Sequence, residues 1–195
     1  MIVLDRVSFG YNRGEDVLKD FSLELPDEGR ICLFGRSGCG KSTILRLVMG
    51  LSRPGSGRIT GTEELSISAV FQEDRLLPWK TVLENAALFS DRDRAEELLT
   101  ALGLGEVLHS LPAELSGGMK RRAALGRALS HPFDLLILDE PFTGLDEETK
   151  KTAIALVDRA VQGRMLLMAT HDPEEARALG TEIVQVGCDS KEVEQ

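Results

Sequence analysis

The chain has 195 residues, enough for one compact domain with its own core but few for two. Its 42% hydrophobic and 28% charged residues are typical of an ordinary globular protein and exclude a fibrous or largely disordered one. The formal net charge of −9 disfavours nucleic acid as a general partner, although the basic run Lys120–Arg122 could attract phosphate locally.

The sequence carries no pattern of a membrane span or of a signal peptide. The longest apolar runs, Leu135–Leu138 and Met165–Ala169, are of strand length, and the N-terminal segment lacks a basic region followed by an apolar one. We therefore expect a cytoplasmic protein whose membrane contact comes through a partner. Cys32, Cys39 and Cys188 are odd in number and lack the spacing of metal ligands, which predicts reduced thiols.

The N-terminal part of the chain predicts strands followed by a helix. Strand patterns cover Ile2–Phe9, Phe21–Leu25 and Ile31–Phe34, and the last of these runs directly into a glycine-rich turn. Apolar residues at helical spacing then predict a helix over Lys41–Met49, which ends at Gly50 as a C-terminal stop.

The rest of the chain alternates helical and strand patterns. Thr81–Leu108 combines leucines at helical spacing with many charges, which predicts a separate helical lobe. Leu135–Leu138 predicts a strand, Glu147–Gln162 a helix, and Met165–Ala169 another strand. Such alternation favours an α/β fold with a mostly parallel sheet covered by helices and with ligands at the carboxyl ends of its strands.

A phosphate-binding loop pattern, G-x-x-x-x-G-K-[ST], follows the third predicted strand and opens the helix after it. Its glycines let backbone N–H groups face a phosphate, and the helix dipole adds positive potential there. Lys41 would reach the terminal phosphates, Ser42 would bind Mg²⁺, and Thr43 would support an adjacent phosphate. The expected nucleotide-binding residues of this loop are Gly35, Arg36, Ser37, Gly38, Cys39, Gly40, Lys41, Ser42 and Thr43.

Two adjacent carboxylates, Asp139 and Glu140, follow the apolar run Leu135–Leu138. Phosphoryl transfer needs one carboxylate near Mg²⁺ and a second group that orients or activates the attacking water. The position at a strand end beside a phosphate loop therefore assigns Asp139 to the metal and Glu140 to the water. A solvated surface pair is the alternative.

The segment Leu115–Lys120 reads LSGGMK and precedes a helical pattern, so that Ser116, Gly117 and Gly118 lie at a helix N-terminus. Backbone amides, a hydroxyl and a helix dipole form a second anion site there. Lying between the phosphate loop and the Asp139–Glu140 strand, this segment resembles the signature motif of ABC transporter ATPases. That resemblance implies that it caps the terminal phosphate of ATP held by a second copy of the chain. Met119 stands where family members often carry Gln.

Four further residues match the family's motifs in order. The resemblance implies that Tyr11 stacks on adenine, that Gln72 contacts Mg²⁺ and water, that Asp146 touches the opposite subunit, and that His171 senses the terminal phosphate. Each residue also has a structural alternative: Tyr11 could pack in the core, Gln72 could be a plain strand-end glutamine, and His171 could be a structural histidine. Asp146 could be a helix N-cap, a role that could coexist with the subunit contact.

The segment Leu76–Asn85 is similar to the one by which importer ATPases meet their membrane subunits, and most like that of nitrate, sulfonate and taurine importers. Trp79 is the expected partner anchor, although it could instead pack the two lobes together. Between Lys41 and Gln72 the chain is shorter than in most family members, which leaves fewer residues for a complete antiparallel β subdomain.

The resemblance, which runs from about Val3 to Val186, implies a P-loop NTPase with a mostly parallel sheet, a small antiparallel β subdomain and a helical subdomain at about residues 73–130 of one domain spanning 1–195. It implies an ATPase with ATP and Mg²⁺ that works as a dimer on the cytoplasmic face of the cell membrane, bound to integral transporter subunits and most like those of importers. The alternatives are a soluble ATPase of the same family acting on nucleic acid or ribosomes, and a nucleotide-binding subunit without turnover.

Overall fold

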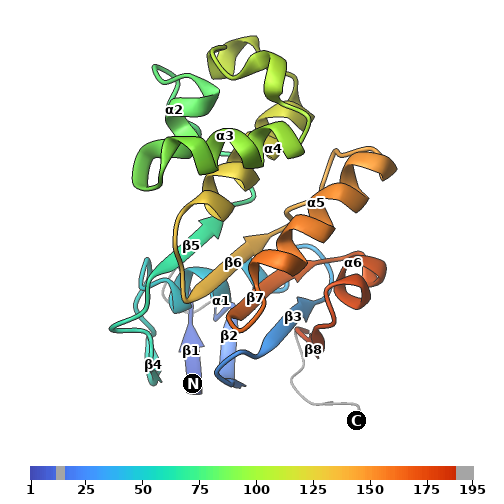
Figure 1. The fold of residues 1–195 in the computed structure, drawn as a ribbon. Helices are drawn as coiled ribbons and strands as arrows, with labels where there is room; N and C mark the ends of the chain where they lie inside the picture. The colour runs from blue at the N-terminus through green and yellow to red at the C-terminus, as the bar shows by residue number, and fades with distance from the viewer. Residues whose placement is uncertain (12–15, 188–195) are drawn as a thin grey trace.

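The computed structural model describes residues 1–11 and 16–187, so Cys188 lies outside the described residues. The fold contains two β-sheets with helices around them (Figure 1). None of the helices within the described ranges is both long and apolar enough to cross a membrane. The strands are β1 Ile2–Phe9, β2 Leu18–Leu25, β3 Arg30–Phe34, β4 Ser56–Thr60, β5 Ile67–Val70, β6 Leu135–Asp139, β7 Met165–Thr170 and β8 Glu182–Gln185.

The larger sheet has the strand order β5-β6-β7-β3-β8, and all its neighbours pair in parallel. Every residue of β6 and β7 is buried, as expected for central strands whose two faces are both covered. The predicted parallel sheet is therefore confirmed. The edge strand β8 was not predicted, because its residues are mostly exposed and do not form a clear apolar pattern.

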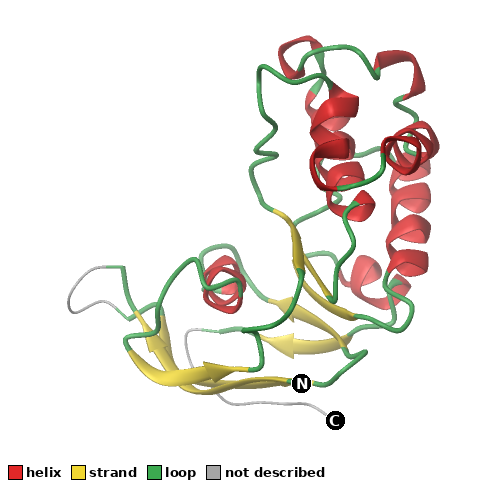
Figure 2. Ribbon diagram, turned by 60° about the vertical axis from the view of Figure 1, so that its left-hand side comes forward, coloured by secondary structure: helices red, strands yellow, loops and turns green. Residues whose placement is uncertain are grey.

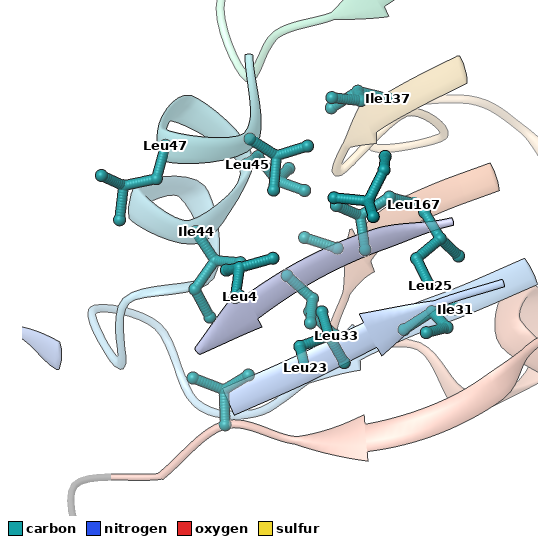
Figure 3. Close-up of a cluster of buried hydrophobic side chains, with 14 of the residues drawn as sticks. Leu4, Leu23, Leu25, Ile31, Leu33, Ile44, Leu45, Leu47, Ile137 and Leu167 are labelled. Carbon is teal, nitrogen blue, oxygen red and sulfur yellow. The ribbon is translucent and has the colours of Figure 1, made fainter. Parts of the chain in front are cut away.

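Helices cover both faces of the parallel sheet (Figure 2). Side chains alternate along each strand: Leu33 faces the cluster that holds α1, whereas Cys32 faces the cluster that holds α5 and α6. Figure 3 shows the first cluster, in which α1 packs between the two sheets. The α-helices are α1 Lys41–Val48, α2 Val82–Ala86, α3 Arg92–Ala101, α4 Gly117–Ser130, α5 Glu147–Ala160 and α6 Pro173–Ala178.

The smaller sheet is antiparallel, with the order β2-β1-β4. The short segment between Lys41 and Gln72 still supplies β4, so the antiparallel subdomain is present. Gly57 permits the close approach of β4 to β1: its φ is 78°, and a Cβ at this position would lie 2.2 Å from the carbonyl oxygen of Arg6.

Helices α2, α3 and α4 gather on one side of the molecule next to β5 (Figure 1). Their own apolar cluster includes Leu83, Leu99 and Ala123. Thr81–Leu108 is not one helix: α2 ends in a 3-10 turn, Asp91 caps a new helix, and α3 stops before Gly103 at φ 71°. We call α2, α3, α4, their connecting turns and residues 76–81, which lead into α2, the helical lobe.

Candidate active site

The phosphate-loop segment connects β3, which lies between β7 and the edge strand β8, to α1. Gly38 and Gly40 have φ of 82° and 102°, a region that side chains disfavour. A Cβ at Gly35 would lie 2.3 Å from the carbonyl oxygen of Val186 and 2.8 Å from Sγ of Cys39. The Lys41 ammonium donates to the carbonyls of Gly35 and Arg36 at 2.7 and 3.2 Å. The loop therefore folds tightly around the lysine head group.

A cleft of about 1150 Å³ opens beside this loop and extends to the helical lobe. Its walls come from the carboxyl ends of the parallel strands, as predicted. Four predicted site residues do not line the cleft: Gly35, Cys39, Ser116 and Asp146. The predicted residues that line it are Tyr11, Arg36, Ser37, Gly38, Gly40, Lys41, Ser42, Thr43, Gln72, Gly117, Gly118, Asp139, Glu140 and His171.

Asp139 is the last residue of β6 and is buried at the floor of the cleft. Burial raises the pKa of its carboxyl, while a hydrogen bond from Ser42 and the charges of Arg121 and Lys41 act to lower that pKa. The Ser42 hydroxyl and the Asp139 carboxylate thus present adjacent oxygens. This donor set suits Mg²⁺, which prefers oxygen ligands and takes few of them from protein when phosphates supply others.

Glu140 and His171 form a pair at the strand ends of β6 and β7. Nδ1 of His171 lies 2.8 Å from Oε2 of Glu140. Glu140 has φ of 50°, rare for a residue with a side chain, and its N–H donates to the Ala169 carbonyl at 2.9 Å. The backbone at Glu140 leaves the strand geometry here, and its side chain lines the cleft rather than the sheet interior.

Tyr11 stands at the edge of the cleft and is 57% exposed. Its hydroxyl is 3.1 Å from Oγ1 of Thr43, and its ring packs edge-on against Phe9 at 5.0 Å. This exposure disfavours the core-packing alternative and leaves the ring available for stacking. Asp146 caps α5 by accepting from the N–H of Thr149 at 3.0 Å, which confirms the N-cap reading without excluding a subunit contact.

The signature segment begins α4. The Ser116 side chain caps this helix by accepting from the N–H of Met119 at 3.3 Å. Met119 packs against the apolar cluster of the helical lobe. An apolar side chain at this position therefore contributes to the lobe's core.

One residue that sequence reasoning interpreted differently is Arg121. The sequence left open that the basic run Lys120–Arg122 attracts phosphate, but Arg121 is only 4% exposed, and Arg122 donates to the carbonyls of Leu102 and Gly103. Arg121 donates instead to protein oxygens around the cleft. The helical spacing of the apolar residues Ala124, Leu125 and Ala128 was the available signal, but it does not reveal which arginine turns inward.

A second group of residues that was not predicted from the sequence holds the backbone around His171. Lys150, from α5, contacts Asp172 at 3.1 Å and Glu175 at 3.3 Å. Thr170 donates to the buried Glu175 at 2.6 Å. Burial raises the pKa of Glu175, and its hydrogen bonds with Thr170 and Lys150 oppose that rise. These contacts fix the segment on both sides of His171, and only the sequence HD-x-x-E itself could have suggested them.

Comparison with known proteins agrees with the geometry. Residues 18–143 match the family model described as ABC transporter. The aliphatic sulfonates import ATP-binding protein SsuB of Pectobacterium atrosepticum is 41% identical over 95% of this chain and 73% of its own length. SsuB 1 of Burkholderia lata is 43% identical over 94% of this chain, which spans 56% of that relative.

A solved structure of the ATP-binding cassette MJ0796, described as a dimeric post-hydrolysis state bound to ADP and Pi, superposes with a TM-score of 0.87 at 29% identity. The superposition covers 96% of the present chain and 94% of the solved chain. The present chain belongs to the ABC transporter family. It is an ATPase domain of that family, and the predicted family and fold class are confirmed.

Proposed function

We propose that this ATPase domain drives import through a membrane transporter by binding and hydrolysing Mg-ATP between two copies of itself. The proposal rests on the observation that the phosphate loop, Asp139, Glu140 and His171 all line one cleft. We further propose that residues 1–195 form one domain, with a helical subdomain at about 73–130.

Each site residue has a distinct task in this proposal. Lys41 would hold the terminal phosphates, and the loop amides would bind the remaining phosphate oxygens. Ser42, Asp139 and Gln72 would hold Mg²⁺, which would neutralise charge on the phosphates. Tyr11 would stack on the adenine ring.

The proposed catalytic group is the Glu140 carboxylate, which would orient a water molecule and accept its proton as the water attacks the terminal phosphorus and ADP leaves. Nδ1 of His171 lies 2.8 Å from that carboxylate and would donate to it, and Nε2 would contact a phosphate oxygen. Gln72, which lines the same cleft, would complete the water's contacts.

The dimer would complete each site. Ser116, Gly117 and Gly118 of one copy would cap the ATP held by the other, and Asp146 would lie against the opposite copy. The solved relative's description as a dimer with ADP and Pi supports this arrangement.

Membrane attachment would come through integral subunits that contact Leu76–Asn85. Trp79 is 71% exposed, which favours a partner anchor over lobe packing. Asn85 fixes the backbone of this segment, because its side chain bonds to Leu77, Lys80 and Thr81. The relatives' names support import, with aliphatic sulfonates as the transported class, over action on nucleic acid or ribosomes. The chain would then work at the cytoplasmic face of the membrane.

Three measurements test the proposal. Purified protein should release phosphate from ATP with Mg²⁺ and stop when EDTA removes the metal; no release above a Lys41→Ala control would contradict the proposed turnover. Tagged chain extracted from native membranes should carry an integral protein with it, and cells lacking the chain should lose uptake of a labelled alkanesulfonate. Retained uptake would contradict the proposed substrate class.

A further inference from the structure

Arg121 occupies the junction between the helical lobe and the catalytic strand ends. Its Nη1 donates to the carbonyls of Phe71 and Gln72 at 2.6 and 3.3 Å and lies 3.2 Å from the Asp74 carboxylate. Its Nη2 donates to the carbonyl of Asp139 at 2.8 Å and to that of Glu140. A single guanidinium thus joins two separate segments of the cleft.

The position of this guanidinium in α4 matters as much as its contacts. Arg121 is five residues after Ser116, or about 7.5 Å along the helix axis. The next apolar residues divide between the lobes, since Ala123 packs into the helical-lobe cluster and Leu125 into the cluster on the parallel sheet. Arg121 therefore lies where α4 passes from one lobe to the other.

Burying a guanidinium is costly unless hydrogen bonds and a counter-charge compensate it, and here four backbone carbonyls and the Asp74 carboxylate do so. Arginine's planar fork fixes the direction of each donor, unlike the single ammonium of lysine. Nε of Arg121 is buried and has no hydrogen-bond partner within residues 1–11 and 16–187. The side chain is thus held by its two terminal nitrogens: Nη1 bonds to residues 71–74 and Nη2 to residues 139–140.

We propose that Arg121 is a positioning residue that couples the signature end of α4 to the catalytic end of β6. By holding the carbonyls of Asp139 and Glu140, it fixes the uncommon backbone at Glu140 and so the direction of the carboxylate that activates water. By holding Phe71 and Gln72, it sets the other proposed water contact from the same point. Seating of Ser116–Gly118 on the partner's ATP would therefore align the catalytic groups in the same subunit.

This coupling rests on the proposed ATP-bound dimer, and a neighbouring arginine supplies a matched control. Arg127 also lies on α4 and donates to the carbonyls of Asp74 and Arg75 at 3.1 and 2.8 Å. It contacts the same loop as Arg121 but makes no hydrogen bond to Asp139 or Glu140. Substituting each arginine by Gln therefore distinguishes two effects: loss of contact between α4 and the loop at residues 71–75, and loss of the hydrogen bonds to Asp139 and Glu140.

The kinetic experiment compares Arg121→Gln, Arg121→Lys and Arg127→Gln with unmutated protein. We expect Arg121→Gln to lower kcat by about a hundredfold, since small misplacements of a reacting group have effects of that order. ATP affinity should stay within about twofold because the phosphate loop is untouched. Arg121→Lys should be intermediate, and Arg127→Gln should keep kcat within about threefold.

Two further measurements separate positioning from assembly and folding. Sedimentation with Mg-ATP in a Glu140→Gln background should show the dimer with or without Arg121→Gln. Hydrogen exchange of the apo protein should show faster exchange at residues 139–143 in Arg121→Gln but not in Arg127→Gln.

The outcomes are distinct. Unchanged kcat in Arg121→Gln, an equal loss in Arg127→Gln, or loss of the dimer with Arg121→Gln would overturn the positioning role. If unmutated protein shows no hydrolysis, the proposed function fails. The exchange measurement then decides the inference alone, because unchanged exchange at 139–143 would still overturn it.

Discussion

The parallel-sheet body and the helical lobe differ in how they hold their functional residues. In the body, the phosphate loop and the Asp139–Glu140 pair leave strands that are buried on both faces, so chain continuity places the chemistry. The helical lobe has a separate apolar cluster and exposes Trp79 and Phe89 to solvent. Groups that react are anchored in the sheet, whereas the signature segment and the proposed membrane-contact segment lie on the lobe that is joined to it through α4.

The largest expected effect removes chemistry from the body alone. Glu140→Gln keeps shape and hydrogen-bonding capacity but removes the carboxylate that would accept the water's proton. Turnover should fall by about a hundredfold to ten-thousandfold, while Mg-ATP affinity persists because Lys41, Ser42 and Asp139 remain. Phosphate release and equilibrium nucleotide binding measure the two quantities. Glu97→Gln, on the exposed face of α3, is the control, and a Glu140→Gln protein with unmutated turnover would disprove the catalytic assignment.

The next change lies in the lobe and tests whether it completes a site in another copy. The stalled Glu140→Gln protein should form an ATP-dependent dimer, and adding Ser116→Arg should weaken that dimer at least about a hundredfold by burying an unpaired charge in the interface. Sedimentation with Mg-ATP measures this.

Ser116→Ala is the matched control for that dimer, since it removes the cap on α4 at a cost of about 1 kcal/mol without adding bulk or charge. A stalled protein that remains monomeric at high concentration would argue against a shared site.

A smaller effect should separate partner contact from nucleotide binding. Trp79→Ala should weaken association with the membrane subunits by about thirtyfold, as expected for a buried aromatic anchor, while ATP binding stays nearly intact. Pull-down and thermal melting measure association and folding. Phe89→Ala removes the lobe's other strongly exposed aromatic, at 75% exposure, and is the control. Equal losses of folding and association in Trp79→Ala would favour lobe packing instead.

The smallest effect probes the phosphate loop itself. Cys39 is 8% exposed beside Gly35, whereas burial raises the pKa of the Cys32 thiol to about 11. In a Cys188→Ser protein, a small alkylating reagent should therefore modify Cys39 slowly and Cys32 hardly at all. Mg-ATP well above its Kd should slow modification of Cys39 by about tenfold. Mass spectrometry measures both sites, and equal modification with and without nucleotide would contradict the placement of the loop.

Local sequence specified most of the body, and the prediction of β1 matched its bounds from Ile2 to Phe9. The glycine pattern after β3 identified the phosphate loop because positive φ at Gly38 and Gly40 is a local requirement. The helix boundaries in the helical lobe were harder to predict from the sequence. Their caps at Asp91 and Gly103 interrupt a pattern whose leucines alone suggest one continuous segment.

The sequence by itself determined the family, the α/β class, the phosphate loop and the carboxylate pair, because each depends on residues that are adjacent in the chain. Only the tertiary structure decided that His171 meets Glu140, that Lys150 supports the histidine segment, and that Arg121 turns inward. These contacts join residues 18 to 50 positions apart through the pairing of β6 with β7 and the packing of α4 on both lobes. No local pattern records a contact of that kind, since its geometry depends on how separate elements pack.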